Sequence, residues 1–199
     1  GLIISDEVQT GFGRTGKHWF GIEHWGIEPD IITCAKAMAN GTPVGATVTT
    51  AEIAAAITGA QISTFGGNPV TATAALATIE VIEEEGLLEN SATLGRKFAD
   101  GLEYLKASHE IVGDVRGMGL MRAIELVHDK ESKQPAPTAM NALLEATREN
   151  GLLIGKGGLY GNSVRLSPPL NITKANVDEA IDILDKSLSH VEQIEMGNS

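Results

Sequence analysis

Asp6 and Lys36 are the residues of this sequence best suited to chemistry, because each lies where a short apolar run ends. Residues 2–5 (LIIS) lead into Asp6, and residues 31–34 (IITC) precede Lys36 by one alanine. Such runs are typical of buried strands, and open α/β sheets bind ligands at the carboxyl ends of their strands. A lysine and a carboxylate suit pyridoxal 5'-phosphate, which needs a Schiff-base amine and an anion beside its pyridine nitrogen. Taken alone the pair is not specific, since most Asp and Lys residues at strand ends are solvated.

Three ordered motifs make the signal more specific. They are residues 6–16 (DEVQTGFGRTG), 29–36 (PDIITCAK) and 63–69 (STFGGNP). Together they resemble the class III, or omega-amino-acid, aminotransferases, and the likeness extends over about residues 2–190. Residues 113–121 (GDVRGMGLM) and 172–174 (ITK) resemble most the branch that holds the alanine-glyoxylate aminotransferase 2 type and bacterial 4-aminobutyrate aminotransferases.

The resemblance implies roles for four residues of the first two motifs. Lys36 holds pyridoxal phosphate as a Schiff base and, once displaced by the substrate amine, moves the proton between the substrate carbon and the cofactor C4'. Asp6 pairs with the pyridinium nitrogen and stabilises the protonated ring. Val8 forms the apolar surface under the ring, on the side of Asp6 if the chain stays extended, and Gln9 hydrogen-bonds near the phenolic oxygen. Outside the family, these would be ordinary loop and core residues.

The resemblance also assigns roles to Thr64 and Arg165. Thr64 precedes two glycines and an expected helix start, where a hydroxyl and free backbone amides suit phosphate. In the family this threonine binds the phosphate of the neighbouring subunit's cofactor, which implies at least a dimer. Arg165 matches the arginine that forms a bidentate pair with the substrate α-carboxylate. Outside the family, Thr64 reads as a turn or capping residue and Arg165 as a surface residue on an edge strand.

The elements that position these residues follow from the spacing of apolar and turn residues. Asn68 and Pro69 predict a helix N-cap and first helical position, and Thr173 predicts the cap of a last helix. Strands are expected at residues 2–5, 31–34, 46–50, 111–116, 120–127, 152–154 and 164–166, and helices at residues 70–85, at 88–107, ending near 150, and after 173.

This order predicts an α/β protein with a mainly parallel sheet in its first part. The resemblance implies the fold type I architecture of pyridoxal-phosphate transferases, with residues 1–87 as the C-terminal part of the large cofactor-binding domain. Residues 88–199 would then form the bridging helix and a small C-terminal α/β domain. The family's chains are about twice as long, and this sequence starts without Met on an apolar run. We therefore expect a C-terminal fragment that is inactive by itself.

Composition and charge exclude several other classes of function. The chain has 199 residues with 15 Lys and Arg against 26 Asp and Glu, a net charge of -11 that disfavours nucleic acid and anionic membranes. No apolar run approaches the roughly 20 residues needed to span a bilayer. Cys34 is the only cysteine, so neither an internal disulfide nor a thiolate zinc site is possible, and packing is its favoured role. The five histidines lack metal-binding spacing, so no metal is expected.

The predicted activity is transfer of an amino group from an amino acid, either an omega-amino acid or alanine, to a 2-oxo acid through pyridoxal phosphate on Lys36. Two alternatives remain open. One is another reaction on the same scaffold, such as an aminomutase or a decarboxylase, and the other is a non-catalytic fragment or interaction module. The expected partners are the two substrates and a second subunit, in the cytoplasm or the mitochondrial matrix.

Overall fold

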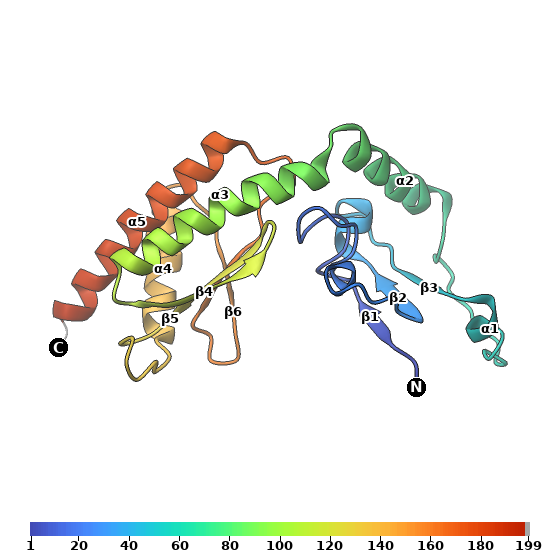
Figure 1. The fold of residues 1–199 in the computed structure, drawn as a ribbon, viewed down its shortest axis with the longest axis horizontal. Coiled ribbons are helices and arrows are strands. Elements are labelled where there is room, and N and C mark those ends of the chain that lie inside the picture. Colours follow the sequence, from blue (N-terminus) through green and yellow to red (C-terminus); the bar gives the residue numbers. More distant parts are fainter. Residues whose placement is uncertain (198–199) are drawn as a thin grey trace. The chain divides into compact units, whose positions relative to one another are not determined.

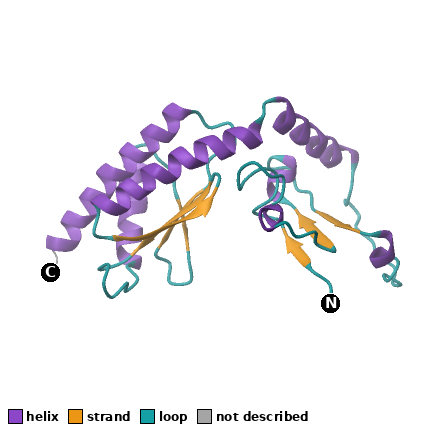
Figure 2. Cartoon of the chain, viewed as in Figure 1, coloured by secondary structure: helices purple, strands orange, loops and turns teal. Residues whose placement is uncertain are grey.

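The computed structural model describes residues 1–197, which divide into two compact units (Figure 1). The first unit is Gly1–Ser91, and the second begins at Ala92. Each unit has a sheet of its own together with helices, as the colouring by secondary structure in Figure 2 shows. The molecule is therefore an α/β protein.

The first unit contains a three-stranded sheet in the order β1-β2-β3. Strand β1 (Ile4–Asp6) runs parallel to β2 (Ile31–Cys34), and β3 (Ala46–Thr49) runs antiparallel to β2. The sheet is thus mixed, with one parallel and one antiparallel pair. Strand β1 begins two residues later than expected and includes Asp6. The N–H of Ile3 donates to the side chain of Asp30, just before β2.

Four helices complete the first unit: η1 (Gly21–Trp25), η2 (Lys36–Ala39), α1 (Ala51–Ala54) and α2 (Pro69–Glu84). The expected N-cap of α2 is confirmed, since Asn68 Oδ1 accepts hydrogen bonds from the backbone N–H groups of Val70 and Thr71. Helix α2 packs against η2. The three shorter helices were not predicted, because a single turn carries too few residues to show a 3.6-residue period.

The second unit is built on a four-stranded antiparallel sheet in the order β4-β5-β7-β6. Its strands are β4 (Val112–Met118), β5 (Met121–Leu126), β6 (Gly155–Gly157) and β7 (Ser163–Leu166). Its helices are α4 (Pro137–Glu149), α5 (Lys174–Gly197) and most of α3 (Leu87–Ser108), which starts in the first unit. Residues from all three helices and from the sheet form one hydrophobic core. It includes Leu102, Ile124, Leu143, Val164 and Leu184, all fully buried.

The strand expected at residues 152–154 was wrong, and the paired segment starts at Gly155. The N–H of Leu152 donates to the carbonyl of Thr147 at 2.8 Å, which leaves Leu152 bonded to the end of α4. Pairing begins where Gly155 lies opposite Arg165. The apolar side chains of Leu152 and Ile154 pack partly against the core and do not mark strand pairing, and Leu153 between them is exposed.

His109 ties the end of α3 to helix α5. It is 4% exposed, with Nδ1 2.9 Å from Oε2 of Glu192 and Nε2 2.8 Å from Oδ1 of Asp185. The second oxygen of Glu192 accepts a hydrogen bond from the N–H of Ile111 at 3.2 Å. One buried ring thus joins two carboxylates of the last helix to the connection before β4.

We expect His109→Leu to lower the free energy of unfolding by about 2 kcal/mol, because it removes both contacts and leaves the partly buried Glu192 with one donor. Urea unfolding of the full-length protein measures this. The control is His190→Leu, an exposed histidine on α5 that should change the value by less than about 0.5 kcal/mol. Equal effects of the two variants would contradict the role given to His109.

Candidate active site

The parallel pairing of β1 and β2 brings Asp6 and Lys36 to one edge of the sheet. Asp6 is the last residue of β1 and lies opposite Thr33 of β2, three residues before Lys36. The next backbone hydrogen bond, from the N–H of Glu7 to the carbonyl of Thr33 at 2.9 Å, extends the pairing beyond Asp6. The segments that follow β1 and β2 therefore leave the sheet at the carboxyl ends of the strands, where α/β proteins bind ligands.

Asp6 presents a carboxylate with one oxygen engaged. Its Oδ1 accepts a hydrogen bond from the N–H of Val8 at 3.1 Å and another from the hydroxyl of Thr33 at 3.3 Å. Within residues 1–197, Oδ2 accepts none, and the side chain is exposed. A carboxylate fixed through one oxygen, with the other available, fits a partner that carries a protonated ring nitrogen.

The chain does not remain extended after Asp6, so the condition attached to Val8 is not met. Val8 lies in a turn, closed by its N–H bond to Asp6, and is half-buried. Gln9 follows in the same turn and is exposed. The alternation of a strand therefore gives no reason to place Val8 on the side of Asp6, and its contact with a cofactor ring rests on the family resemblance.

Lys36 has an unusual backbone conformation. It is the first residue of η2 and has a φ of 49°, in the left-handed region that non-glycine residues seldom occupy. The preceding residue, Ala35, is extended, and its carbonyl accepts a hydrogen bond from the N–H of Met38 at 3.1 Å. Such strain persists only where neighbouring structure imposes it, and it gathers at functional sites. The side chain of Lys36 is exposed.

Cys34 is a buried core residue at the end of β2. Burial raises the pKa of its thiol, and the negative charge of Glu7 raises it further. A thiol held protonated is a poor nucleophile. The strand also ends before Lys36, so the two residues do not share a strand face, and packing accounts for Cys34.

Glu7 is a functional candidate that the sequence did not single out. It is 2% exposed, and its carboxylate accepts four hydrogen bonds: from the hydroxyls of Ser5 (2.8 Å) and Thr10, and from the N–H groups of Gly21 (2.7 Å) and Ile22 (2.8 Å). Burial, the largest single influence, raises the pKa of Glu7, but the four hydrogen bonds together outweigh it and hold the pKa below the usual value. The sequence feature that could have indicated Glu7 is its place between the hydroxyl residues Ser5 and Thr10, just before a glycine-rich segment.

Thr64 lies in an exposed segment ahead of α2, and no contact joins it to Asp6 or Lys36 in the part of the chain that the structure describes. The amides of Val70 and Thr71 at the start of α2 are already bound by Asn68. The free amides expected at this helix start are therefore partly occupied. A phosphate contact here would depend on the Thr64 hydroxyl and on the amides of the loop before Asn68.

Arg165 belongs to the second unit, on strand β7. This strand lies between β5 and β6, so Arg165 is on an interior strand and not on an edge. Its neighbours Val164 and Leu166 are buried, whereas Arg165 is exposed, as strand alternation requires.

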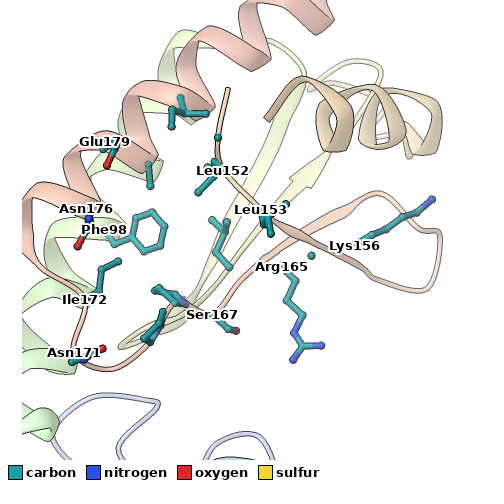
Figure 3. A pocket seen from close by; sticks show the side chains of 17 residues that line it. Phe98, Leu152, Leu153, Lys156, Arg165, Ser167, Asn171, Ile172, Asn176 and Glu179 are labelled. Atoms are coloured by element: carbon teal, nitrogen blue, oxygen red, sulfur yellow. The ribbon is translucent and has the colours of Figure 1, made fainter. Parts of the chain in front are cut away.

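Arg165 also borders a groove of about 820 Å³. The groove lies beside α5, and Phe98, Leu152, Ile172 and Glu179 are among its other lining residues. Figure 3 shows the Arg165 side chain extending away from Phe98 and Glu179. The guanidinium thus lies at the rim of the groove and not in its apolar interior.

A family model for class-III aminotransferases matches residues 1–188. The chain belongs to the class-III aminotransferase family. Enzymes of this family depend on pyridoxal phosphate, and the donor set of Asp6 and Lys36 at one sheet edge fits that group. The described residues contain no group of three His, Cys, Asp or Glu that could hold a metal ion, and no helix among them is long and apolar enough to cross a membrane.

Relatives within the family differ in the reactions that their names give. The chain is 49% identical over 190 residues to an alanine–glyoxylate aminotransferase 2 homologue of Arabidopsis thaliana, covering 95% of this chain and 40% of that protein. It is 43% identical over 198 residues to a leucine/methionine racemase of Thermococcus litoralis, covering 99% of this chain and 44% of that one. A solved Bacillus anthracis aminotransferase matches with a TM-score of 0.89 at 39% identity, covering 95% and 45% of the two chains. The chain thus spans less than half the length of these relatives.

The lowered pKa of Glu7 gives a testable pH dependence. Because the pKa is lower in the folded than in the unfolded chain, the stabilisation is complete above the usual value of about 4.5 and is lost as the pH falls through the folded value. We expect Glu7→Gln to lower the free energy of unfolding by about 2 kcal/mol at pH 7 and by less below pH 4. Urea unfolding of the full-length protein at both pH values measures the difference. If the difference in free energy of unfolding between wild type and Glu7→Gln were larger below pH 4 than at pH 7, Glu7 would not be ionised in the folded protein.

Proposed function

We propose that the protein carrying these residues is a transaminase that passes an amino group from an amino acid to a 2-oxo acid with pyridoxal phosphate on Lys36. The observation that carries the proposal is the parallel register of β1 and β2, which brings Asp6 and Lys36 to one sheet edge. Membership of the class-III family supports it.

Each residue has a defined task in this proposal. Pyridoxal phosphate, when bound, supplies an electron-accepting ring that makes a C–H bond of the amino acid acidic. Oδ2 of Asp6 would accept a hydrogen bond from the ring nitrogen and keep it protonated. Nζ of Lys36 would take the proton from the substrate carbon and deliver it to the cofactor C4'. Val8 would contact the ring, and Gln9 would hydrogen-bond near its phenolic oxygen.

The proposed substrate class is supported by Arg165, in the role that the family resemblance gives it. A guanidinium presents two parallel N–H donors that match a carboxylate, so Arg165 would orient the acid group common to the amino acid and the oxo acid. We propose alanine as amino donor, supported by the alanine–glyoxylate relative, with omega-amino acids as the second candidate class.

The proposal includes a second copy of the protein. The Thr64 hydroxyl would bind the phosphate of a cofactor held by the neighbouring subunit, which accounts for its lack of contact with Asp6 and Lys36. Residues 1–87 would be part of the large cofactor-binding domain, and residues 88–199 the bridging helix and the small domain. The proposed setting is the cytoplasm or the mitochondrial matrix.

A second candidate function is a different reaction of the same amino acid, because a relative at 43% identity is named a racemase. Racemisation needs the same amine and the same ring environment but no oxo acid. Loss of optical rotation of L-alanine without consumption of an oxo acid would favour it, as amine formation without an oxo acid would favour a decarboxylase.

The covalent site can be tested by borohydride reduction of the full-length protein after incubation with pyridoxal phosphate. We expect the reduced pyridoxyl group on the peptide that contains Lys36, and its loss in Lys36→Ala. The left-handed backbone at this position is as unfavourable for alanine as for lysine, so the substitution does not relieve it. Loss of the label would therefore report the missing amine. Lys17→Ala, an exposed lysine of the same unit, should keep the label. A folded protein without label on Lys36 would overturn the proposal.

The role of Arg165 can be tested with Arg165→Lys, which keeps the charge but loses the two-pronged geometry. We expect the KM for alanine to rise by about 10- to 100-fold, the loss of one strong charged hydrogen bond. The KM for 2-aminopropane, which has no carboxylate, should stay within about twofold. Equal effects on the two amines would show that Arg165 does not bind the acid group.

A further inference from the structure

The glycine-rich segment after β1 is folded around the carboxylate of Glu7. The four donors come from β1, from the turn that follows it and from the start of η1, which lies 14 residues along the chain. Two glycines allow the close approach. A Cβ on Gly11 would lie 2.8 Å from the carbonyl oxygen of Glu7, and one on Gly21 would lie 2.8 Å from Cβ of Thr10 and 3.3 Å from Oε2 of Glu7.

The same residue is also bonded through its backbone to the strand that leads to Lys36. Its N–H donates to the carbonyl of Thr33, and its carbonyl accepts a hydrogen bond from the N–H of Gly11 at 3.0 Å. Glu7 is thus held on both sides by β2 and by the loop. Its chain neighbours are Asp6 and Val8, and Gln9 follows one residue later, so the residues proposed to contact the cofactor lie on either side of this fixed point.

We propose that Glu7 is a positioning residue of the active site, whose buried carboxylate fixes the segment that presents Asp6 and Gln9 to the cofactor. This inference rests on the proposed function. Positioning matters because a displacement of about 1 Å in a group that binds the reacting molecule can cost on the order of 100-fold in rate. Glu7 itself contacts neither cofactor nor substrate in this account, since it is buried among its four donors.

Only a carboxylate satisfies this arrangement. Each oxygen of Glu7 accepts two hydrogen bonds: Oε1 from Ser5 and Ile22, and Oε2 from Thr10 and Gly21. A glutamine in the same place would turn an NH2 group toward one of these pairs. Since both backbone N–H groups are donors only, either orientation leaves a buried N–H facing another donor. The segment must then shift, and Asp6 shifts with it.

The test compares wild type with Glu7→Gln in the full-length protein, using three readouts. These are the dissociation constant of pyridoxal phosphate for the apoprotein, the pH midpoint of the visible absorption of the loaded protein, and the far-UV circular dichroism of the apoprotein. We expect cofactor binding to weaken about tenfold or more and the midpoint to move by about half a pH unit or more, with the dichroism unchanged. A residue that served stability alone would move neither the dissociation constant nor the midpoint.

The matched control is Glu23→Gln. Glu23 lies in the same segment, is exposed, and accepts a hydrogen bond from the N–H of Phe20 at 2.7 Å. A glutamine can keep that bond through its carbonyl oxygen, so this variant removes the same charge without turning a donor toward buried N–H groups. Both cofactor readouts should stay at their wild-type values. A response equal to that of Glu7→Gln would overturn the inference in favour of a general charge effect.

If Glu7→Gln does not fold, the variant Thr10→Val provides the test with Glu7 intact. It replaces the hydroxyl of one of the four donors by a methyl group of the same size. We expect it to weaken cofactor binding about threefold and to move the pH midpoint of the visible absorption. Unchanged values in a folded variant, for either substitution, would overturn the inference and leave the proposed function intact. A wild-type protein that takes no pyridoxal phosphate on Lys36 would overturn both.

Discussion

The parallel hydrogen bonding of β1 with β2 is the constraint on which the candidate active site depends. Three residue pairs, from Ile4 opposite Ile31 to Asp6 opposite Thr33, define it. Parallel strands end at the same edge of a sheet, so a carboxylate and an amine that lie 30 residues apart in sequence leave the sheet together. A slip of one residue would turn Asp6 to the other face and separate its Oδ1 from Thr33. The loop that follows β1 is ordered by the four hydrogen bonds to Glu7 and by the edge-on ring contacts of the buried Phe12 with Trp19 and Phe20.

The two units are stabilised in different ways, which suits their proposed tasks. In the second unit, helices and sheet share a continuous apolar core, and polar contacts such as those of His109 join helix ends. In the first, a buried carboxylate organises a loop rich in glycine. Hydrogen bonds are directional, so a loop built on them holds side chains in defined orientations.

Much of this architecture was visible in the sequence, and the failures have physical causes. Strand β2 and the Asn68 cap were predicted correctly, because a short β-branched run and an Asn-Pro pair are strong local signals. The strand expected at residues 152–154 was wrong because Leu152 and Ile154 pack against the core without pairing to another strand. Two of the four donors to Glu7 lie 14 and 15 positions away, which no local pattern reveals. The left-handed backbone of Lys36 likewise has no signal in the neighbouring residue types.

That backbone conformation sets stability and function against each other at a single position. For any residue other than glycine, and to a lesser degree asparagine, the left-handed region costs about 1 kcal/mol. Glycine at position 36 would relax the chain, yet it would remove the amine on which the proposed chemistry depends. Selection of variants for folding alone would thus enrich the residues that abolish activity. A lysine at this position therefore fits the proposed chemistry better than it fits the backbone conformation.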